Sequence, residues 1–318
     1  MQVEEITKEQ YAKLTPEFRY VYMTEEFNSL NAYKVDEVKY LLFKSNKKRF
    51  SLVAGLINNE LRCPFSAPYG MINVFKKNTS IGNFIDMVEA LKIYCVDNKI
   101  SALKLTLPPT FYDEKNINKF VNSLINSGAT IETMDLNFHI DLDKVKHNKY
   151  EKLMTCAARN SLNISLVKGN RFIIADECRY KEAYEVIAQN KSFKGYPLRM
   201  SFEQVKQTVQ IVKHSCFIVE NNGTAVASAI VYEVNSDVAQ VIYWGDIPNV
   251  TELKCMNFLS SNVVEHYKNR GFKYFDIGPS TEDGVPNVGL CDFKESIGCD
   301  ISAKFTLKIE FKNLISRS

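Results

Sequence analysis

The chain has 318 residues, 45% of them hydrophobic, so it is long enough to build two domains with a core each. Its 40 basic and 37 acidic residues leave a formal net charge of +3, which excludes a global field that would attract DNA or an anionic membrane. The N-terminus MQVEEITKEQYAKL lacks the apolar stretch of a signal peptide, and no later apolar run has the length of a membrane span. We therefore expect a cytoplasmic protein without membrane insertion.

The first half predicts a strand pair, a helix and a further strand, followed by a second helix and strand. Residues 49–74 alternate as two strands around a turn at Asn58-Asn59, and residues 81–98 have the apolar spacing of an amphipathic helix. The remaining elements are the strand 101–107, stopped by two prolines, the helix 114–128, ended by a glycine, and the strand 134–142.

The second half repeats this order. Residues 216–245 predict a hairpin turned by Asn221-Asn222-Gly223 and a third strand, before a helix at 253–271 and a strand at 272–278. Between the halves, residues 149–170 predict a basic helix and a short strand, and residues 183–212 two helices around a Gly-Tyr-Pro turn. The repeat predicts two tandem α/β domains, 1–150 and 151–318.

The eight cysteines are scattered and form no CxxC pair or other spacing typical of zinc sites. Only four histidines are present, and none lies near the two cysteines, Cys291 and Cys299, that flank the most loop-rich segment. We expect free thiols, no metal site and no tightly bound cofactor.

The segment 271–298 predicts a ligand-binding loop. The strand FKYFDIG stops at Gly278-Pro279, and further glycines precede and follow the pair Phe293-Lys294. Glycines allow the backbone to approach a ligand closely, and Asp283 and Asn287 add polar groups. An ordinary surface loop rich in turn formers is the alternative.

The same segment resembles the C-terminal part of Fem-type transferases and of GNAT-fold N-acyltransferases. The matching pieces are Phe275-Asp276-Ile277-Gly278, Gly289-Leu290 and the run from Phe293 to Gly298. Ile297 stands where the relatives usually carry a second Phe. The resemblance implies two tandem GNAT-like domains of the α+β type, each a mixed, mostly antiparallel sheet flanked by helices.

The resemblance also implies site residues. Lys294 would assist acyl transfer and Phe293 would shape the pocket beside it. Substrate-binding positions would be Tyr69, in a Pro-Tyr-Gly element of the first domain, and seven residues of the second half: Arg159, Tyr196, Tyr243, Trp244, Asn257, Asp276 and Asn287. From the sequence alone, the alternative is a surface position for Lys294 and Arg159. It is core packing for Tyr243 and Trp244, and burial at the closure of a loop for Tyr196.

The acyl donor stays open between an acyl-coenzyme A and an aminoacyl-tRNA. Simple GNAT enzymes bind the pyrophosphate of coenzyme A on a glycine-rich loop before the central helix. The corresponding loop, Gly245 to Leu253, has one glycine and two acidic residues. A tRNA donor usually needs a basic patch, which the net charge does not indicate.

The function expected from this resemblance is transfer of an acetyl, other acyl or aminoacyl group to an amine of a nucleotide sugar or another precursor in cell-envelope, polysaccharide or peptidoglycan biosynthesis. The alternative is a non-catalytic GNAT-like protein that binds such a precursor during envelope or polysaccharide assembly.

Overall fold

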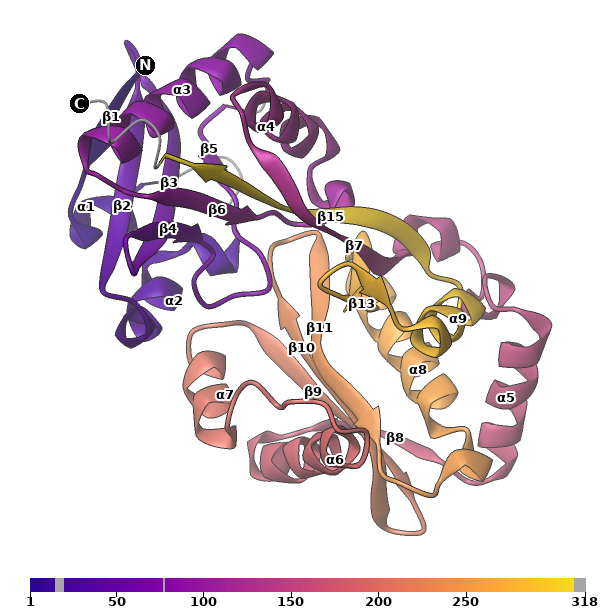
Figure 1. The fold of residues 1–318 in the computed structure, drawn as a ribbon. Coiled ribbons are helices and arrows are strands. Elements are labelled where there is room, and N and C mark those ends of the chain that lie inside the picture. Colours follow the sequence, from indigo (N-terminus) through magenta and orange to yellow (C-terminus); the bar gives the residue numbers. More distant parts are fainter. Residues whose placement is uncertain (15–19, 77, 312–318) are drawn as a thin grey trace. The chain divides into compact units, whose positions relative to one another are not determined.

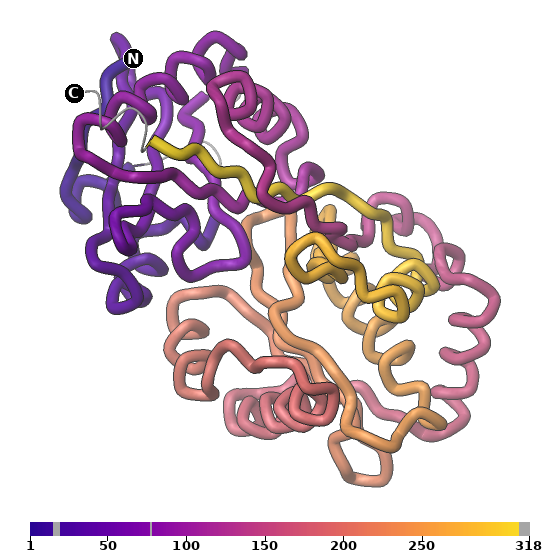
Figure 2. Tube along the Cα trace, in the orientation of Figure 1, coloured from indigo at the N-terminus to yellow at the C-terminus, as the bar shows by residue number. Residues whose placement is uncertain are grey.

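The computed structural model describes residues 1–14, 20–76 and 78–311 and divides into two compact units. The first unit contains Met1–Asp135 together with the chain from Ser302, and the second contains Leu136–Ile301. Figures 1 and 2 let the chain be followed into the second unit along β7 (Thr130–Asp141) and back into the first along β15 (Asp300–Glu310).

The first unit is a mixed sheet with two long helices. Its strands are β1 (Gln2–Glu5), β2 (Glu37–Lys44), β3 (Lys48–Ile57), β4 (Glu60–Cys63), β5 (Asn73–Val74) and β6 (Ala102–Thr106), and its α-helices are α1 (Lys8–Ala12), α2 (Glu25–Leu30), α3 (Ile81–Asp97) and α4 (Glu114–Asn126). Phe84 of α3 contacts Phe50 of β3 and Phe120 of α4, at 5.1 and 6.4 Å between ring centroids. These buried rings join the helices to the sheet.

The second unit is a sheet with helices on both faces. Its strands are β8 (Arg171–Ala175), β9 (His214–Asn221), β10 (Thr224–Glu233), β11 (Val238–Asp246) and β12 (Tyr274–Pro279), and its α-helices are α5 (Cys156–Val167), α6 (Tyr180–Phe193), α7 (Phe202–Val209), α8 (Cys255–Asn269) and α9 (Val288–Ser296). The short strands β13 (Thr281–Glu282) and β14 (Val285–Pro286) pair with each other in a separate two-stranded sheet. Ala227 and Ala229 belong to the core under α5 and α8, whereas Ser228 between them donates to the carbonyl of Ala183 in α6. Successive side chains of β10 thus pack into two different layers, one on each face of the sheet.

The repeated plan expected from the sequence is present. In the first unit α3 joins β4 to the parallel strand β6, and in the second α8 joins β11 to the parallel strand β12. Most other strand pairs are antiparallel. The predicted fold class, a mixed and mostly antiparallel sheet flanked by helices in each of two units, is therefore confirmed.

The two units exchange their final strands, and this changes their limits from 1–150 and 151–318. β7 follows α4 of the first half, yet its residues Asn137–Asp141 pair with β12 of the second unit. β15 follows α9 of the second half, yet its residues Thr306–Glu310 pair with β6 of the first. A boundary drawn from consecutive elements in the sequence cannot show such an exchange.

Candidate functional site

The parallel strands β11 and β12 separate after three residue pairs. They pair in parallel only from Val238 with Tyr274 to Gln240 with Asp276. Beyond that point β11 continues beside β10 as far as Asp246, and β12 continues beside β7. Among the described pairings, the edge of β11 that faces β12 has no strand partner after Gln240. Its backbone N–H and C=O groups are available to a ligand.

Asp276 lies where the two strands separate. It is fully buried, and its carboxylate accepts hydrogen bonds from Asn137 Nδ2 at 2.7 Å, Gln240 Nε2 at 2.7 Å and the Gly278 backbone N–H at 2.9 Å. These donors come from β7, β11 and β12 itself. The carboxylate therefore ties together the three strands that define the separation.

Lys294 of α9 lies under the end of β12. Its ammonium donates to the carbonyl oxygens of Ile277 at 3.1 Å, Gly278 at 2.8 Å and Pro279 at 3.0 Å, and lies 5.2 Å from the Phe138 ring centroid. Its side chain is 2% exposed. Three N–H groups thus match three consecutive carbonyls, and the positive charge is held next to the point where β11 and β12 part.

Titration of Lys294 should appear in the stability of the protein. Burial away from water lowers the pKa of Lys294 to about 8, whereas an unfolded chain gives a lysine pKa of about 10.4. Between these values the unfolded chain holds a proton that the folded protein releases, so this lysine makes the free energy of unfolding rise with pH in that window. Below this pH window, Lys294 is protonated in both the folded and the unfolded protein. Folding then carries the full free-energy cost of burying its ammonium.

Chemical denaturation at several pH values measures this effect as the difference between the wild type and Lys294→Met. As the pH rises from the folded to the unfolded pKa of Lys294, we expect the free energy of unfolding of the wild type to increase relative to that of the variant by up to about 3 kcal/mol. A constant difference from pH 7 to pH 10.5 would contradict a lysine held charged in a desolvated position.

Phe293 and Trp244 form an apolar wall on the α8 face of the sheet. Both side chains pack against the core of the second unit, and their rings meet edge to face at 6.3 Å between centroids. Phe293 immediately precedes Lys294 on α9, and Trp244 lies on the part of β11 that pairs with β10 and no longer with β12. This places the two aromatic residues beside the separation.

Two further predicted residues meet across loops. Asn287 caps α9 by accepting from the Leu290 N–H at 3.0 Å, and its Nδ2 donates to the Tyr196 hydroxyl at 2.7 Å. The Lys191 ammonium lies 5.5 Å from the Tyr196 ring centroid, and burial, followed by the charge of Lys194, lowers the pKa of Lys191. The loop after α6 and the loop after β12 therefore meet through Tyr196 and Asn287. Together they form one polar surface with two cations, Lys191 and Lys194.

The other predicted residues lie apart from this surface or have a structural partner. Tyr243 is half-buried on β11, facing opposite to Trp244. Arg159 of α5 donates to Cys156 Sγ at 3.0 Å, and the side chain of Asn257 is half-buried on α8. Tyr69 belongs to the first unit, where it is fully buried.

In the first unit the corresponding parallel strands are β4 and β6, and the segment of Tyr69 and Gly70 covers the strand edge where their pairing ends. β4 and β6 pair as far as Cys63 with Leu105, and the Gly70 N–H then donates to the Thr106 carbonyl at 2.8 Å. The ring of Tyr69, next in the chain to Gly70, packs against Tyr22 and Tyr112, each at 5.0 Å between centroids. Among the described pairings, the second unit is therefore the one in which the strand edge stays open, and it holds the candidate site.

The loop before α8 carries acidic groups, as the sequence indicated. Asp246 Oδ1 and its carbonyl oxygen accept from Asn190 Nδ2 at 3.1 and 2.7 Å, and Glu252 is exposed two residues before the helix N-cap. Gly245 lies against α6 so closely that an added Cβ would be 2.6 Å from Asn190 Cγ. This loop is fastened to α6 by its acidic residue and offers no glycine-rich phosphate cradle.

Several residues of the site were not predicted from the sequence. Asn137, Gln240 and Phe138 lie on strands and carry no motif, and Lys191 lies inside an amphipathic helix. Only their position beside Asp276, Lys294 or Tyr196 gives them importance. The one signal in the sequence concerns Gln240, a polar residue among the apolar residues of β11. A polar side chain at a buried position of a strand indicates a specific partner.

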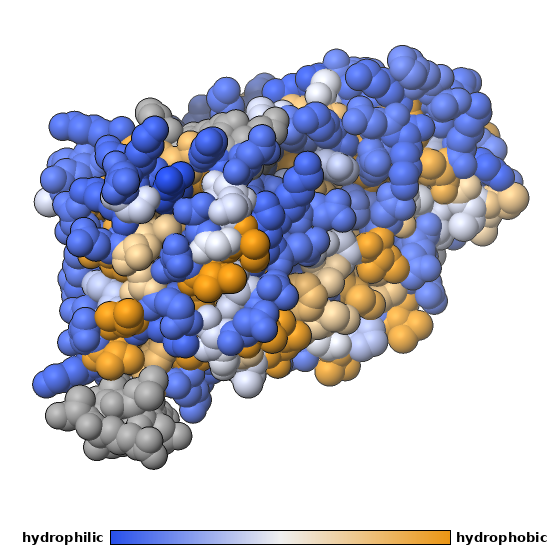
Figure 3. Space-filling model, turned by 90° about the horizontal axis from the view of Figure 1, so that it is seen from above, coloured by the Kyte–Doolittle hydropathy of each residue, from blue (hydrophilic) through white to orange (hydrophobic). Residues whose placement is uncertain are grey.

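Within the described residues, no group of three or more His, Cys, Asp or Glu side chains is arranged to hold a metal ion. None of the described helices combines the length and the apolar character that spanning a bilayer requires. The face in Figure 3 is mainly hydrophilic, with apolar side chains in small groups between the polar ones.

Comparison with known proteins gives a fold. No family model and no curated protein matches the sequence. Among solved structures, FemX superposes with a TM-score of 0.72 over 100% of this chain and 99% of its own, at 10% identity. L-PGS from Bacillus licheniformis gives 0.59 over 96% and 92% at 13% identity. A tandem GNAT protein from the clavulanic acid biosynthesis pathway gives 0.50 over 86% and 83% at 9% identity.

At such identities the likeness concerns the arrangement of the chain and not its reaction. The superposition nevertheless extends over the whole chain for FemX and over most of it for the other two structures. The chain therefore has the tandem GNAT-like fold of FemX, and the resemblance to Fem-type transferases that its sequence suggested is confirmed as a resemblance of fold.

Proposed function

We propose that the second unit transfers an acyl or aminoacyl group from an ester or thioester donor to an amine of a cell-envelope precursor. The observation that carries this proposal is the unpaired edge of β11 beside a buried ammonium, that of Lys294. Amide formation through a tetrahedral intermediate needs N–H donors and positive charge near the carbonyl oxygen, and both are available there.

In this reaction the amine nitrogen forms a bond to the carbonyl carbon while the bond from carbon to the leaving oxygen or sulfur breaks. The proton released by the amine passes to the leaving group. Backbone N–H groups of β11 after Gln240 would donate to the carbonyl oxygen as it gains charge, and Lys294 would stabilise that charge. Phe293 and Trp244 would exclude water from the acyl group, and Tyr196 and Asn287 would bind the acceptor.

We propose an aminoacyl-tRNA as the donor. The acidic loop around Asp246 and Glu252 disfavours the diphosphate of coenzyme A. Residues 144–171 of the second unit carry seven basic residues and one acidic residue, Glu151, although the whole chain has a net charge of only +3. Lys144 and Lys146 pair with Asp300 and Asp143, and the other five basic residues leave a local excess of the kind that attracts a polyanion.

The alternative function, binding without catalysis, rests on one observation. All three N–H groups of Lys294 are directed at backbone carbonyls, so the ammonium also has a structural use. A protein that only binds the acceptor would need this lysine for the shape of the loop and not for its charge.

The decisive experiment incubates the purified protein with an amine-bearing nucleotide sugar and with either charged tRNA or acyl-coenzyme A, and reads the mass of the acceptor. We expect an aminoacyl mass increase with charged tRNA alone. An increase with acyl-coenzyme A alone would make the donor assignment wrong. Thermal stabilisation by the acceptor without any product would establish the binding alternative.

The donor assignment has a matched control pair. The double variant Lys149→Glu, Lys152→Glu should raise KM for charged tRNA about tenfold or more, because it reverses two charges of the basic segment. Lys115→Glu, an exposed change on α4 of the first unit, should leave that KM within twofold.

A further inference from the structure

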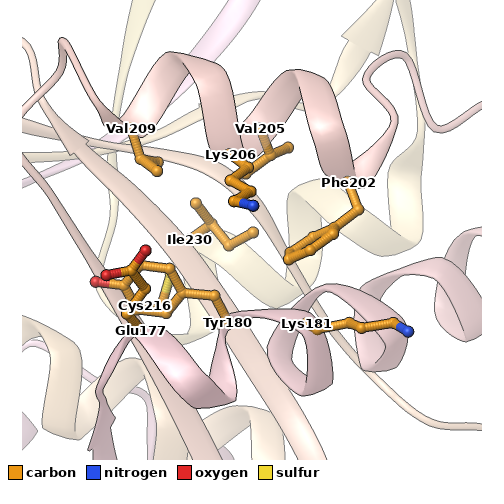
Figure 4. A pocket seen from close by; sticks show the side chains of 9 residues that line it. All are labelled: Glu177, Tyr180, Lys181, Phe202, Val205, Lys206, Val209, Cys216 and Ile230. Carbon is orange, nitrogen blue, oxygen red and sulfur yellow. The ribbon is translucent and has the colours of Figure 1, made fainter.

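The second unit contains a pocket that the proposed transfer does not use. It has a volume of about 280 Å³ and lies between α6, α7 and the sheet, where it is formed mainly by Phe202, Val205, Lys206 and Val209 of α7 and by Cys216 and Ile230 of the sheet (Figure 4). This volume is just below the range of about 300–1,000 Å³ found for ligand pockets. It suits a small or slender ligand.

The helix α7 directs its packing face into this space. Phe202, Val205, Lys206 and Val209 follow the i, i+3, i+4, i+7 spacing of a single helix face. On a well-packed helix this face would meet large side chains of the sheet. Cys216 and Ile230 are the sheet residues that line the pocket, and their side chains do not fill the space beneath this face.

The floor of the pocket is a pair of neighbouring residues. Cys216 of β9 and Ile230 of β10 are directly opposite each other in the antiparallel pair, and both are 1% exposed. Burial raises the pKa of the Cys216 thiol to about 12, so the thiol is neutral at physiological pH. The deep part of the pocket is therefore uncharged and apolar.

The mouth of the pocket carries a cation. In Figure 4 the Lys206 side chain extends over Ile230, whereas the Lys181 side chain extends away from the other lining residues. Lys181 pairs with Glu185 at 3.8 Å, and Lys206 is exposed. An apolar interior with an ammonium at its entrance matches an amphipathic anion. Glu177 on the opposite side of the mouth restricts the negative group to the side of Lys206.

We propose that this pocket binds an unbranched acyl chain, with its methylene groups over Cys216 and Ile230 and its carboxylate or carboxyl ester beside Lys206. Given that a water-sized group takes up about 30 Å³, the pocket has room for a chain of about eight to ten carbon atoms. The proposal stands apart from the transfer reaction, since none of the residues named for that reaction lines the pocket.

A chain-length series tests the proposal. Calorimetric titration of the protein with straight-chain carboxylates from butanoate to dodecanoate should show affinity rising about fourfold for each added methylene, up to about ten carbons, and then no further. Equal affinity for butanoate and decanoate, or no binding of any chain, would overturn it. Decanoyl-coenzyme A in a parallel titration tells a free fatty acid from a thioester as the source of the chain.

Two variants locate the binding. Val209 is half-buried on the face of α7 that lines the pocket, so Val209→Phe should fill the pocket and weaken decanoate binding at least tenfold. The control Val167→Phe, at a position 88% exposed on α5, should leave decanoate binding unchanged. Lys206→Glu should weaken decanoate about tenfold and leave decanol unchanged, and Lys194→Glu should change neither. Circular dichroism verifies folding of each variant, and unaltered decanoate affinity in Val209→Phe would place the ligand elsewhere and contradict the proposal.

Discussion

Replacing Lys294 by methionine is expected to lower the rate of acyl transfer by a factor of about 10²–10³ and to leave the affinity for the acceptor within threefold. The size follows from the loss of one charge or donor that stabilises an oxyanion. Methionine keeps most of the volume of the lysine stem, so the core around Ile277 and Phe138 should stay filled. Single-turnover kinetics and acceptor titration on the same preparation measure the two quantities.

The control for this variant is Lys115→Met, which removes a charge from an exposed position on α4 of the first unit. Its transfer rate should remain within twofold of the wild type. Lys294→Arg is informative as well, because arginine keeps the charge but cannot direct three N–H groups at the carbonyls of Ile277, Gly278 and Pro279. Full activity in Lys294→Met would remove this lysine from the reaction.

Replacing Asp276 by leucine should destabilise the second unit by about 3 kcal/mol or more. The change leaves the amides of Asn137 and Gln240 and the Gly278 N–H without their shared acceptor in a buried place, and each unsatisfied donor costs about 1–3 kcal/mol. Urea denaturation followed by circular dichroism gives the difference in the free energy of unfolding.

Asp292→Ala on the exposed side of α9 is the matched control and should change stability by less than about 0.5 kcal/mol. The loss of stability in Asp276→Asn should fall between those of Asp276→Leu and Asp292→Ala. The asparagine amide keeps one acceptor oxygen, but its NH2 group replaces the other and faces a hydrogen-bond donor. A loss below 1 kcal/mol in Asp276→Leu would show that the three strands are not held together by this carboxylate.

Much of the fold follows from local patterns in the sequence. The turn at Asn58-Asn59, with φ of 48° and 63°, and the turn at Asn222-Gly223, with φ of 50° and 78°, have the left-handed conformation that these residues tolerate best. The helix α4 ends before Gly128, whose φ is 98°, as the glycine indicated. These predictions succeeded because their causes lie within a few residues.

The exchange of β7 and β15 could not be predicted in the same way. Both strands alternate as expected for strands, yet alternation does not reveal which sheet a strand joins. The pairing of Asn137–Asp141 with β12 is decided by contacts between residues about 140 positions apart. For this reason the two units differ from the ranges drawn from the element order.

The candidate site could be predicted in part. The Phe293-Lys294 pair and Asp276 were singled out by the family resemblance, and Asn287 by its turn chemistry. The acceptors of Lys294 are backbone carbonyls, which carry no signature in the sequence. The difference between the two units, one closed by Tyr69 and its neighbours and the other open along β11, likewise depends on which segment covers a strand edge.

Amide hydrogen exchange during substrate binding tests the location of the site most directly. Peptides covering residues 241–246 and 278–280 are followed with and without a substrate that yields product. Slower exchange in both peptides is the predicted result, because a ligand on the unpaired edge of β11 would occupy its backbone N–H groups. Unchanged exchange there, together with protection of residues 63–70 in the first unit, would contradict a site between β11 and β12.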